Sequence, residues 1–361
     1  FVGADEKKDI VIFVKNATEA INKVAYRLSQ DSDQYIKGKT KSNTINEKYV
    51  ILSTSMEHHS NDLPWRGKYD VEYIEVVKEK LEKYKGRVKL VAVTGASNVT
   101  GYVNPVHKIA EWTHKYGARI LVDGSQLIPH VTFDIKPSTS SKHIDFLVFS
   151  AHKMYAPFGV GVLIGPKSFF EQGSPDYTGG GTVRAVTHDM VVWNDPPSKE
   201  EAGTPNLMGV VALAAAIKNL TSIGMRNVDK HEKALTRQLI NGLKKIDCIE
   251  MYCTEDKSQE RVGIVPFNMK AIYHEQLAEI LAGEAGISVR SGCFCAHPYV
   301  QRLMKIPPEK IHNVIENPQE PKPGMARVSF GLYNEHQEVE KLLRVLREIA
   351  KDRRRYVKLY S

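Results

Sequence analysis

The stretch Asp145-Phe-Leu-Val-Phe-Ser-Ala-His-Lys-Met-Tyr-Ala-Pro-Phe-Gly159 joins an apolar run to a short polar turn that carries Lys153. Residues 146–150 are rich in β-branched and aromatic types, which predicts a buried strand, and the proline and glycine that close the stretch exclude a long helix. We therefore expect Lys153 just past the carboxyl end of a strand, where open α/β sheets bind their ligands. A lysine held there among apolar neighbours is disfavoured as a cation, and a neutral lysine can form a Schiff base.

Ser-Ala-His-Lys at 150–153 also fits a plain polar loop with a solvated lysine. A second stretch, Ala118-Arg-Ile-Leu-Val-Asp123-Gly-Ser-Gln126, favours the first interpretation, because it is another apolar strand and it ends in a carboxylate and an amide. Pyridoxal phosphate enzymes need an Asp or Glu at the ring nitrogen, since the protonated ring is the electron sink. Asp123 and Lys153 together predict a pyridoxal phosphate site.

The composition is that of a globular protein: 361 residues, 42% hydrophobic and 25% charged, enough for two domains. The net charge of +8 comes from scattered residues, and we interpret the basic run 353–355 as the solvated end of a terminal helix, not a nucleic-acid site. The longest apolar run, 207–217, is shorter than the about 20 residues of a membrane span and predicts a buried core helix. Four cysteines and no leader-like segment favour the cytoplasm.

Strands and helices alternate along the first part of the chain, which predicts an α/β fold with a mostly parallel sheet. The expected strands are 9–14, 49–53, 69–76, 88–94, 118–123, 146–150 and 161–165, and the expected helices begin near 18, 77 and 105. After about residue 225 a smaller α+β pattern follows, with strands 261–268, 287–290 and 326–330 and helices 273–285 and 335–351. We predict a large cofactor-binding domain over 1–224 and a small domain over 225–361.

The strand 69–76 runs straight into a helix with no turn residues between them, which is unusual. We expect residues to be missing from the chain at that junction, and also before Phe1, where the sequence begins within a domain.

Three polar residues outside the two strand ends are further candidates. Thr18 lies near a helix N-terminus, where free N–H groups and the dipole favour a phosphate, although a plain N-cap is the alternative. His58 and His59 are adjacent and point apart, with no third ligand at a metal spacing, so we predict no metal and prefer His58 stacked on an aromatic cofactor. Asn98 follows another strand, and we expect it at the same sheet edge as the aspartate and the lysine.

The motifs together resemble the class V aminotransferase family of pyridoxal phosphate enzymes, most closely the group II cysteine desulfurases and selenocysteine lyases. The resemblance implies the fold type I architecture of these enzymes. It spans the chain from Asn16 to the last helix, in seven motifs: Asn-Ala-Thr-Glu at 16–19, Glu-His-His-Ser-Asn at 57–61, Ser-Asn-Val-Thr-Gly at 97–101, Val-Asp-Gly-Ser-Gln at 122–126, Phe-Ser-Ala-His-Lys at 149–153, Ala-Gly-Thr-Pro-Asn at 202–206 and Arg-Ser-Gly-Cys-Phe-Cys at 290–295.

The resemblance also implies a role for each matching residue. Lys153 would hold the cofactor as an aldimine, Asp123 would pair with the ring nitrogen, Gln126 would bond the phenolate oxygen and His58 would stack on the ring. The remaining contacts would be Thr18, Ser150 and His152 to the phosphate, Thr204 to the phosphate of the neighbouring subunit, and Asn98 and Arg327 to the substrate carboxylate. An obligate homodimer with sites at the interface follows from this set.

Cys295 matches the family's nucleophile in Arg-x-Gly-x-x-Cys. A thiolate near the cationic Arg290 would take sulfur from cysteine or selenium from selenocysteine, leaving alanine and, with cysteine, a persulfide for an acceptor protein, as in iron–sulfur cluster assembly. Group II enzymes commonly carry His-His where this chain has Cys293 and Phe294, and a second thiol there can resolve a persulfide or a disulfide. Lys199-Glu200-Glu201 replaces the usual Arg-Phe-Glu before the 202–206 motif.

Other activities fit the same motifs. The Gly-Cys-Phe-Cys loop also resembles less characterised class V members and the sulfurase domain that acts on the molybdenum cofactor. A class V aminotransferase, lyase or epimerase acting on another amino acid would leave Cys295 idle. A scaffold without catalysis is the third possibility, and the intact Lys153 and Asp123 argue against it.

Overall fold

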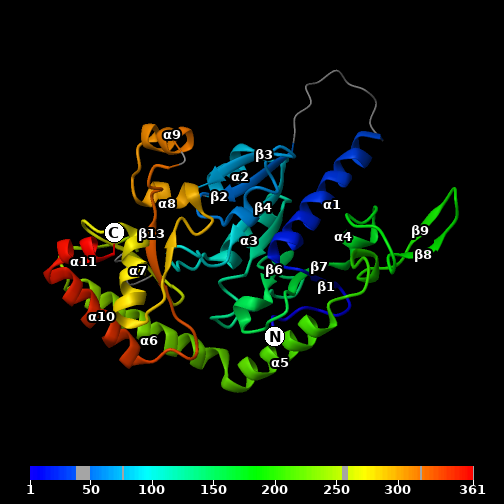
Figure 1. Cartoon of the computed structure of the whole chain (residues 1–361). Helices are drawn as coiled ribbons and strands as arrows, with labels where there is room; N and C mark the ends of the chain where they lie inside the picture. Colours follow the sequence, from blue (N-terminus) through cyan, green and yellow to red (C-terminus); the bar gives the residue numbers. More distant parts are fainter. Residues whose placement is uncertain (38–48, 75–76, 254–258, 318, 361) are drawn as a thin grey trace. The chain divides into compact units, whose positions relative to one another are not determined.

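The computed structural model describes residues 1–37, 49–74, 77–253, 259–317 and 319–360, with the backbone alone for 31–37 (Figure 1). The chain divides into two compact units. The first unit comprises Phe1–Gly95 and Asn104–Gly224, and the second comprises Ala96–Val103 and Met225–Ser361. The two units also divide between residues 224 and 225, where the domain boundary was predicted. They differ from the predicted domains in the short segment 96–103, which is grouped with the second unit.

The first unit contains a seven-stranded sheet in the order β1-β7-β6-β5-β4-β2-β3. Strands β2 to β6 run parallel to one another, whereas β7 is antiparallel to β6 and β1 is antiparallel to β7. This arrangement confirms the predicted α/β fold with a mostly parallel sheet. The strands are β1 (Asp9–Val14), β2 (Val50–Thr54), β3 (Asp70–Ile74), β4 (Val88–Thr94), β5 (Arg119–Asp123), β6 (Phe146–Ser150) and β7 (Gly161–Pro166).

The central strands are apolar because the sheet is covered on both faces. Every residue of β2 and β6 is buried, as expected for strands of a parallel sheet. Helix α1 (Ala17–Lys37) packs on β6 and β7, and its apolar stripe is buried in that core, namely Ile21, Val24, Ala25 and Leu28. Helix α3 (Val106–Lys115) packs on β4 and β5, and α2 (Val77–Lys83) packs on α3.

The end of β6 forms the predicted tight turn. A single 3-10 turn, η2 (Ala151–Met154), carries Lys153, and Tyr155 then adopts a left-handed φ of 63°. Gly161, at the start of β7, lies so close to Asn16 that a Cβ atom there would be 2.6 Å from the Asn16 Cα. Only glycine lets the start of β7 lie against the residue that precedes α1.

The rest of the first unit comprises α4 (Lys167–Glu171), a hairpin of β8 (Val183–Val186) and β9 (Val191–Trp193), η3 (Ser198–Glu200) and α5 (Leu207–Ile223). Figure 1 shows the hairpin projecting away from the large sheet. The prediction of a buried core helix at 207–217 was partly wrong. In α5, Leu213 is buried, but Leu207, Met208 and Val211 are 70%, 64% and 57% exposed, because apolar residues occupy both the packed face and the open face.

The second unit is α+β, as predicted. Its sheet has the order β10-β11-β13-β12, all antiparallel, formed by β10 (Ile249–Met251), β11 (Ile264–Met269), β13 (Met325–Ser329) and β12 (Arg290–Gly292). Helices α6 (Met225–Leu243), α7 (His274–Ala285) and α10 (His336–Lys351) share a core with the sheet. The shorter helices are α8 (His297–Leu303), α9 (Pro308–Glu316) and α11 (Arg353–Leu359).

Two sequence predictions need correction. Of the strand expected at 287–290 only Arg290 belongs to β12, because the residues that pair with β13 are 290–292. The basic run 353–355 opens the separate helix α11 instead of ending α10, since the Asp352 side chain caps α11 by accepting from the Arg355 N–H at 3.2 Å. Of the strand expected at 69–76, the structure describes β3 (Asp70–Ile74), and residues 75 and 76 lie outside the described residues.

Among the helices that the structure describes, none is by itself long and apolar enough to cross a membrane, and only the pair α5 and α6, broken at Gly224, meets that criterion of length and composition together.

Candidate active site

Asp123 and Lys153 lie at the carboxyl ends of neighbouring strands of the first unit, Asp123 within β5 and Lys153 just after β6. Asp123, the last residue of β5, lies opposite Val148 in parallel β6, so both strands end at the same edge of the sheet. The Asp123 carboxylate is only 5% exposed, and its Oδ1 accepts from the Ser125 N–H at 3.0 Å. A carboxylate buried to this degree needs a strong donor or a cation, and a protonated pyridine nitrogen provides both. The environment of Asp123 therefore fits pyridoxal phosphate.

Thr18 and Ser150, two of the predicted phosphate contacts, lie together at the start of α1. The N–H of Ala17 donates to the Ser150 Oγ at 2.9 Å, and both residues are buried. The Thr18 Oγ1 lies 2.6 Å from the hydroxyl of Ser60. Because the N-terminus of a long helix supplies free N–H groups and a positive dipole, these hydroxyls and α1 form a donor set suited to a phosphate.

His58 caps a 3-10 helix, η1 (His59–Asn61), within the same unit. Its Nδ1 accepts from the Ser60 N–H at 3.1 Å, which assigns the proton of the neutral ring to Nε2. The Ser60 hydroxyl lies 3.0 Å from Nδ1, so it connects His58 to Thr18. The sequence analysis missed Ser60, although a hydroxyl two residues after the histidine is the local signal for this contact.

The buried Glu57 is a second residue that was not predicted from the sequence, because nothing in the 57–61 motif indicates that its carboxyl group is buried. Its carboxyl group accepts from the Thr54 hydroxyl at 2.6 Å, the Thr94 N–H at 2.9 Å and the Asn61 amide at 2.7 Å. Burial outweighs these three hydrogen bonds and raises the pKa of Glu57 to about 8, with a smaller contribution from the charge of Asp123. The Glu57 carboxyl group is therefore largely protonated at pH 7.

His152, Gln126 and Thr204 are the remaining predicted cofactor contacts. His152 is exposed at the surface, yet partial desolvation of the ring, followed by the charge of Lys153, lowers its pKa. Gln126 is half-buried in the turn after β5. Thr204 is exposed and lines a cavity of about 410 Å³ together with Glu201, which accepts from the Phe13 N–H at 2.7 Å.

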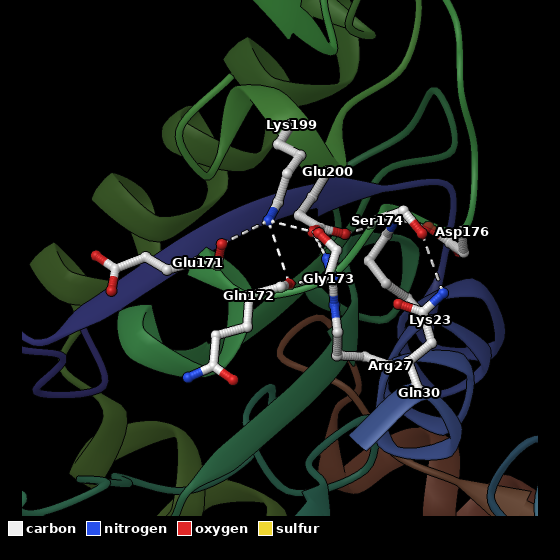
Figure 2. A network of polar contacts seen from close by, with 10 residues as sticks. All are labelled: Lys23, Arg27, Gln30, Glu171, Gln172, Gly173, Ser174, Asp176, Lys199 and Glu200. Carbon is white, nitrogen blue, oxygen red and sulfur yellow. Dashed lines mark hydrogen bonds and ion pairs between the residues drawn. The ribbon is translucent and has the colours of Figure 1, made fainter. Parts of the chain in front are cut away.

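The segment that leads to Thr204 is fixed by the buried Lys199 (Figure 2). The Lys199 Nζ donates to the three consecutive carbonyls of residues 171–173, at 3.1, 3.3 and 3.2 Å. Burial, followed by the charge of Arg27, lowers the pKa of Lys199. The lysine that replaces the family's arginine at this position thus ties η3 to the end of α4.

Glu200 anchors the same segment to α1. Its side chain pairs with Arg27 and lies 3.6 Å from the Nζ of Lys23, which in turn pairs with Asp176. Figure 2 shows these side chains converging between α1 and the segment around 171–176. Glu200, Arg27 and Lys23 are all almost fully buried, so each charge depends on the others.

The predicted nucleophile lies in the second unit, on a strained turn that follows β12. The Ala296 N–H donates to the Cys293 carbonyl at 2.9 Å, and the two central residues, Phe294 and Cys295, have φ values of 53° and 54°. Two successive positive φ values are typical of a type I′ turn, which usually requires Asn or Gly. Each non-glycine residue in this conformation costs about 1–2 kcal/mol. Cys295 is exposed at the turn, and Cys293 is half-buried.

Asn98 and Arg327 hold the turn in place. The Asn98 amide donates to the Phe294 carbonyl at 2.7 Å, and the Arg327 Nη1 donates to the Asn98 carbonyl at 2.6 Å. The Arg327 guanidinium also lies 4.9 Å from the centre of the buried Phe294 ring. The second unit therefore brings together the two predicted substrate contacts and the cysteine turn.

Arg327 keeps a donor that its neighbours do not use. Burial, followed by the charge of Arg290, lowers its pKa to about 10. Within the described residues, its Nε is buried without a hydrogen-bond partner. An unpartnered buried donor of this kind suits an anionic ligand such as a carboxylate.

Comparisons with known proteins bear on the whole chain. The family model described as aminotransferase class V matches residues 1–342. A cysteine desulfurase of Haloferax volcanii is 32% identical over 358 residues, covering 95% of this chain and 75% of the relative. A probable cysteine desulfurase of Pyrococcus abyssi is 34% identical over 359 residues, covering 96% and 80%.

Two solved structures agree with these relatives. The apo structure of a cysteine desulfurase from Thermococcus onnurineus NA1 superposes with a TM-score of 0.80 at 30% identity, covering 94% of this chain and 79% of that chain. The cysteine desulfurase CsdA of Escherichia coli, in an S-sulfonic acid form, gives a TM-score of 0.77 at 26% identity, covering 97% and 79%. The predicted fold is confirmed by both.

Proposed function

Since this chain belongs to the aminotransferase class V family, we propose that it is a pyridoxal-phosphate-dependent cysteine desulfurase that converts L-cysteine to L-alanine. Several relatives and structural neighbours over most of the chain are cysteine desulfurases. The single structural observation that carries the proposal is the exposed Cys295 on its strained turn, because strained backbone is concentrated at functional sites.

The first unit supplies the residues that would hold the cofactor. Pyridoxal phosphate, when bound, withdraws electrons from the amino acid through its protonated ring. Lys153 provides the amine for covalent attachment, Asp123 keeps the ring nitrogen protonated, and His58 offers a flat ring for stacking. The phosphate contacts are Thr18, Ser150 and His152, with Gln126 assigned to the phenolate oxygen.

The second unit supplies the groups for the substrate. Arg327, through its unpartnered Nε edge, and Asn98 are assigned to the substrate carboxylate. The Asn98 amide already donates to the Phe294 carbonyl, so this residue also positions the thiol turn. Cys295, as a thiolate, attacks the sulfur of the substrate and keeps it as a persulfide for an acceptor protein. We also propose that the acceptor protein delivers this sulfur to iron–sulfur cluster assembly.

A homodimer is also part of the proposal. The exposed apolar residues of α5, among them Leu207, Met208 and Val211, support it, because a monomer rarely leaves such a group in water. Thr204 immediately precedes this helix and is assigned to the phosphate of the neighbouring subunit.

The test is alanine formation from cysteine by the cofactor-loaded protein, with a thiol reductant present. Cys295→Ser is expected to keep the visible absorbance of the cofactor and to lose alanine formation, whereas Cys253→Ser, elsewhere in the second unit, should retain both. Lys153→Ala should lose the absorbance of the bound cofactor. Alanine formation undiminished in Cys295→Ser would show that another residue carries the sulfur, and no alanine from the wild type would favour an aminotransferase, lyase or epimerase.

A further inference from the structure

We propose that Cys293 is a resolving thiol for the sulfur carried by Cys295. When no acceptor takes that sulfur, the two cysteines of the turn form a disulfide and release sulfide. This role rests on the proposed function in one respect, because desulfurase turnover is the natural source of the persulfide on Cys295.

The backbone of the turn brings the two cysteines within disulfide range. The hydrogen bond from the Ala296 N–H to the Cys293 carbonyl closes the turn around Cys295. Consecutive Cα atoms are about 3.8 Å apart, so residues two positions apart on a closed turn fall within the roughly 4.4–6.8 Å that a disulfide spans. The turn is not free to open, since Asn98 bonds its central carbonyl and the Phe294 ring is buried beneath Arg327.

Cys293 is placed as a slow nucleophile. It is half-buried, and its thiol donates to the Pro323 carbonyl at 2.9 Å, which requires the protonated form. Burial, followed by the charge of Cys295, raises the pKa of Cys293. The persulfide on the exposed Cys295 therefore has time to meet an acceptor before Cys293 reacts.

Other titratable and charged groups surround Cys293. They lie on the turn itself, on the neighbouring β10, α7, β12 and β13 elements or next to them. The groups are Cys295, Tyr252, Tyr273, His274, Arg290 and Arg327.

The resolving reaction is balanced without an external oxidant. The Cys293 thiolate attacks the Sγ of Cys295, a bond between the two Sγ atoms forms, and the bond from Cys295 to the outer sulfur breaks. The outer sulfur leaves as hydrosulfide with the electron pair, and the proton of the Cys293 thiol goes to solvent. The outer sulfur is reduced to sulfide while the two cysteines are oxidised to a disulfide. A thiol reductant of low molecular mass later restores both thiols.

The experiment loads Cys295 with inorganic polysulfide in thiol-free buffer, so that it does not depend on desulfurase turnover. The cofactor-loaded wild type is compared with Cys293→Ser, Cys293→Ala and the control Cys253→Ser. Trypsin releases both cysteines of the turn on one peptide, residues 291–302, which carries no other cysteine. Mass spectrometry of this peptide and a sulfide assay then follow the reaction.

The wild type and Cys253→Ser should release sulfide and give the peptide with an internal disulfide. Both Cys293 variants should keep the persulfide about tenfold longer or more. Loss of the persulfide in the wild type should accelerate up to about tenfold per pH unit below the Cys293 pKa, and it should not do so in the variants. Loss of the cofactor absorbance would reveal a Cys293 variant that does not fold. The second Cys293 variant then still provides the comparison.

A persulfide equally stable in the wild type and in both folded variants would overturn the proposal. Sulfide release without the internal disulfide would also overturn it, because the outer sulfur would then leave by another route. The alanine assay with cysteine stays separate, so a protein that resolves polysulfide-loaded Cys295 but makes no alanine would fail the proposed function and keep this inference.

Discussion

Two regions are built in opposite ways: the sheet edge of the first unit that carries Asp123 and Lys153, and the turn of the second unit at residues 293–296, called here the thiol turn. Asp123 and Lys153 follow buried strands, and their positions are set by a parallel sheet whose residues pack on both faces. Cys295 lies on a turn with two left-handed residues, held by one amide, one guanidinium and one buried ring. The comparison teaches that the cofactor side is fixed by the fold as a whole, whereas the thiol side depends on a few contacts that a small change can alter.

The buried network around Glu200 offers the largest expected effect, on the cofactor side. Glu200→Ala leaves Arg27 buried without its carboxylate and removes one of the two carboxylates near Lys23, so the free energy of unfolding should fall by about 3–5 kcal/mol. Urea unfolding measures this free energy. The control is Glu171→Ala, at an exposed position of the neighbouring helix α4, which should change the free energy of unfolding by about 0.5 kcal/mol or less. Equal effects of the two substitutions would mean that the network does not fix this region.

Asp123→Asn tests the chemical role proposed for the sheet edge of the first unit. An amide cannot keep the ring nitrogen protonated, so kcat for alanine formation should fall by about 10²–10³-fold while the cofactor remains attached through Lys153. Steady-state kinetics and the visible spectrum report the two properties separately. Asp134→Asn, outside the site, is the control and should leave both unchanged, and a colourless Asp123→Asn protein would instead assign the residue to cofactor retention.

On the thiol side, Phe294 separates packing from backbone strain. Phe294→Ala removes the buried ring and should cost about 3 kcal/mol of stability, since the turn closes partly over the gap. Phe294→Gly loses the same ring but relieves the positive φ, so it should be about 1 kcal/mol more stable than the alanine variant. Denaturant unfolding of the two variants measures this difference in stability. A glycine variant less stable than the alanine variant would show that residue 294 is not left-handed.

The effect expected of Glu57 is a pH slope on the cofactor side, which is small for each pH unit. The folded state raises the pKa of Glu57 from 4.5 to about 8, so it binds a proton that the unfolded chain has already lost between these values. Stability that is fully present below pH 4.5 is therefore lost as pH rises toward 8, by at most about 1.4 kcal/mol per pH unit. Glu57→Gln should flatten this decline in unfolding curves measured from pH 5 to 8, and an unchanged slope would assign it to other groups.

The parts of the fold that the sequence predicted are those with a local pattern. Strand β6 and the turn with Lys153 are encoded by an apolar run followed by proline and glycine within fifteen residues. The exposure of Leu207 was not predictable in this way, because composition does not say which face of an apolar helix is packed. The partners of Glu57 were missed for a similar reason, since Thr94 reaches it from another strand.

The conformation of the thiol turn shows most clearly what a local sequence pattern does not predict. Phe-Cys is not a pair that favours two left-handed residues, so local propensity predicts a different turn. Asn98, which bonds the turn from 196 residues away in sequence, and Arg327, which bonds Asn98 and lies over the Phe294 ring, hold this conformation instead. Tertiary contacts decide the geometry there, and the motifs of the sequence name these residues but not how they are arranged.

The hydrogen bond from the Ala17 N–H to the Ser150 hydroxyl has a consequence for the order of events during synthesis. Its two residues are separated by 133 positions, so the end of α1 that we propose binds the phosphate stays incomplete until the ribosome has passed Ser150. A nascent chain cannot capture the cofactor before that point, and once captured, the cofactor stabilises the native state by mass action. Availability of the cofactor should therefore govern the yield of folded protein in the cell as well as its activity.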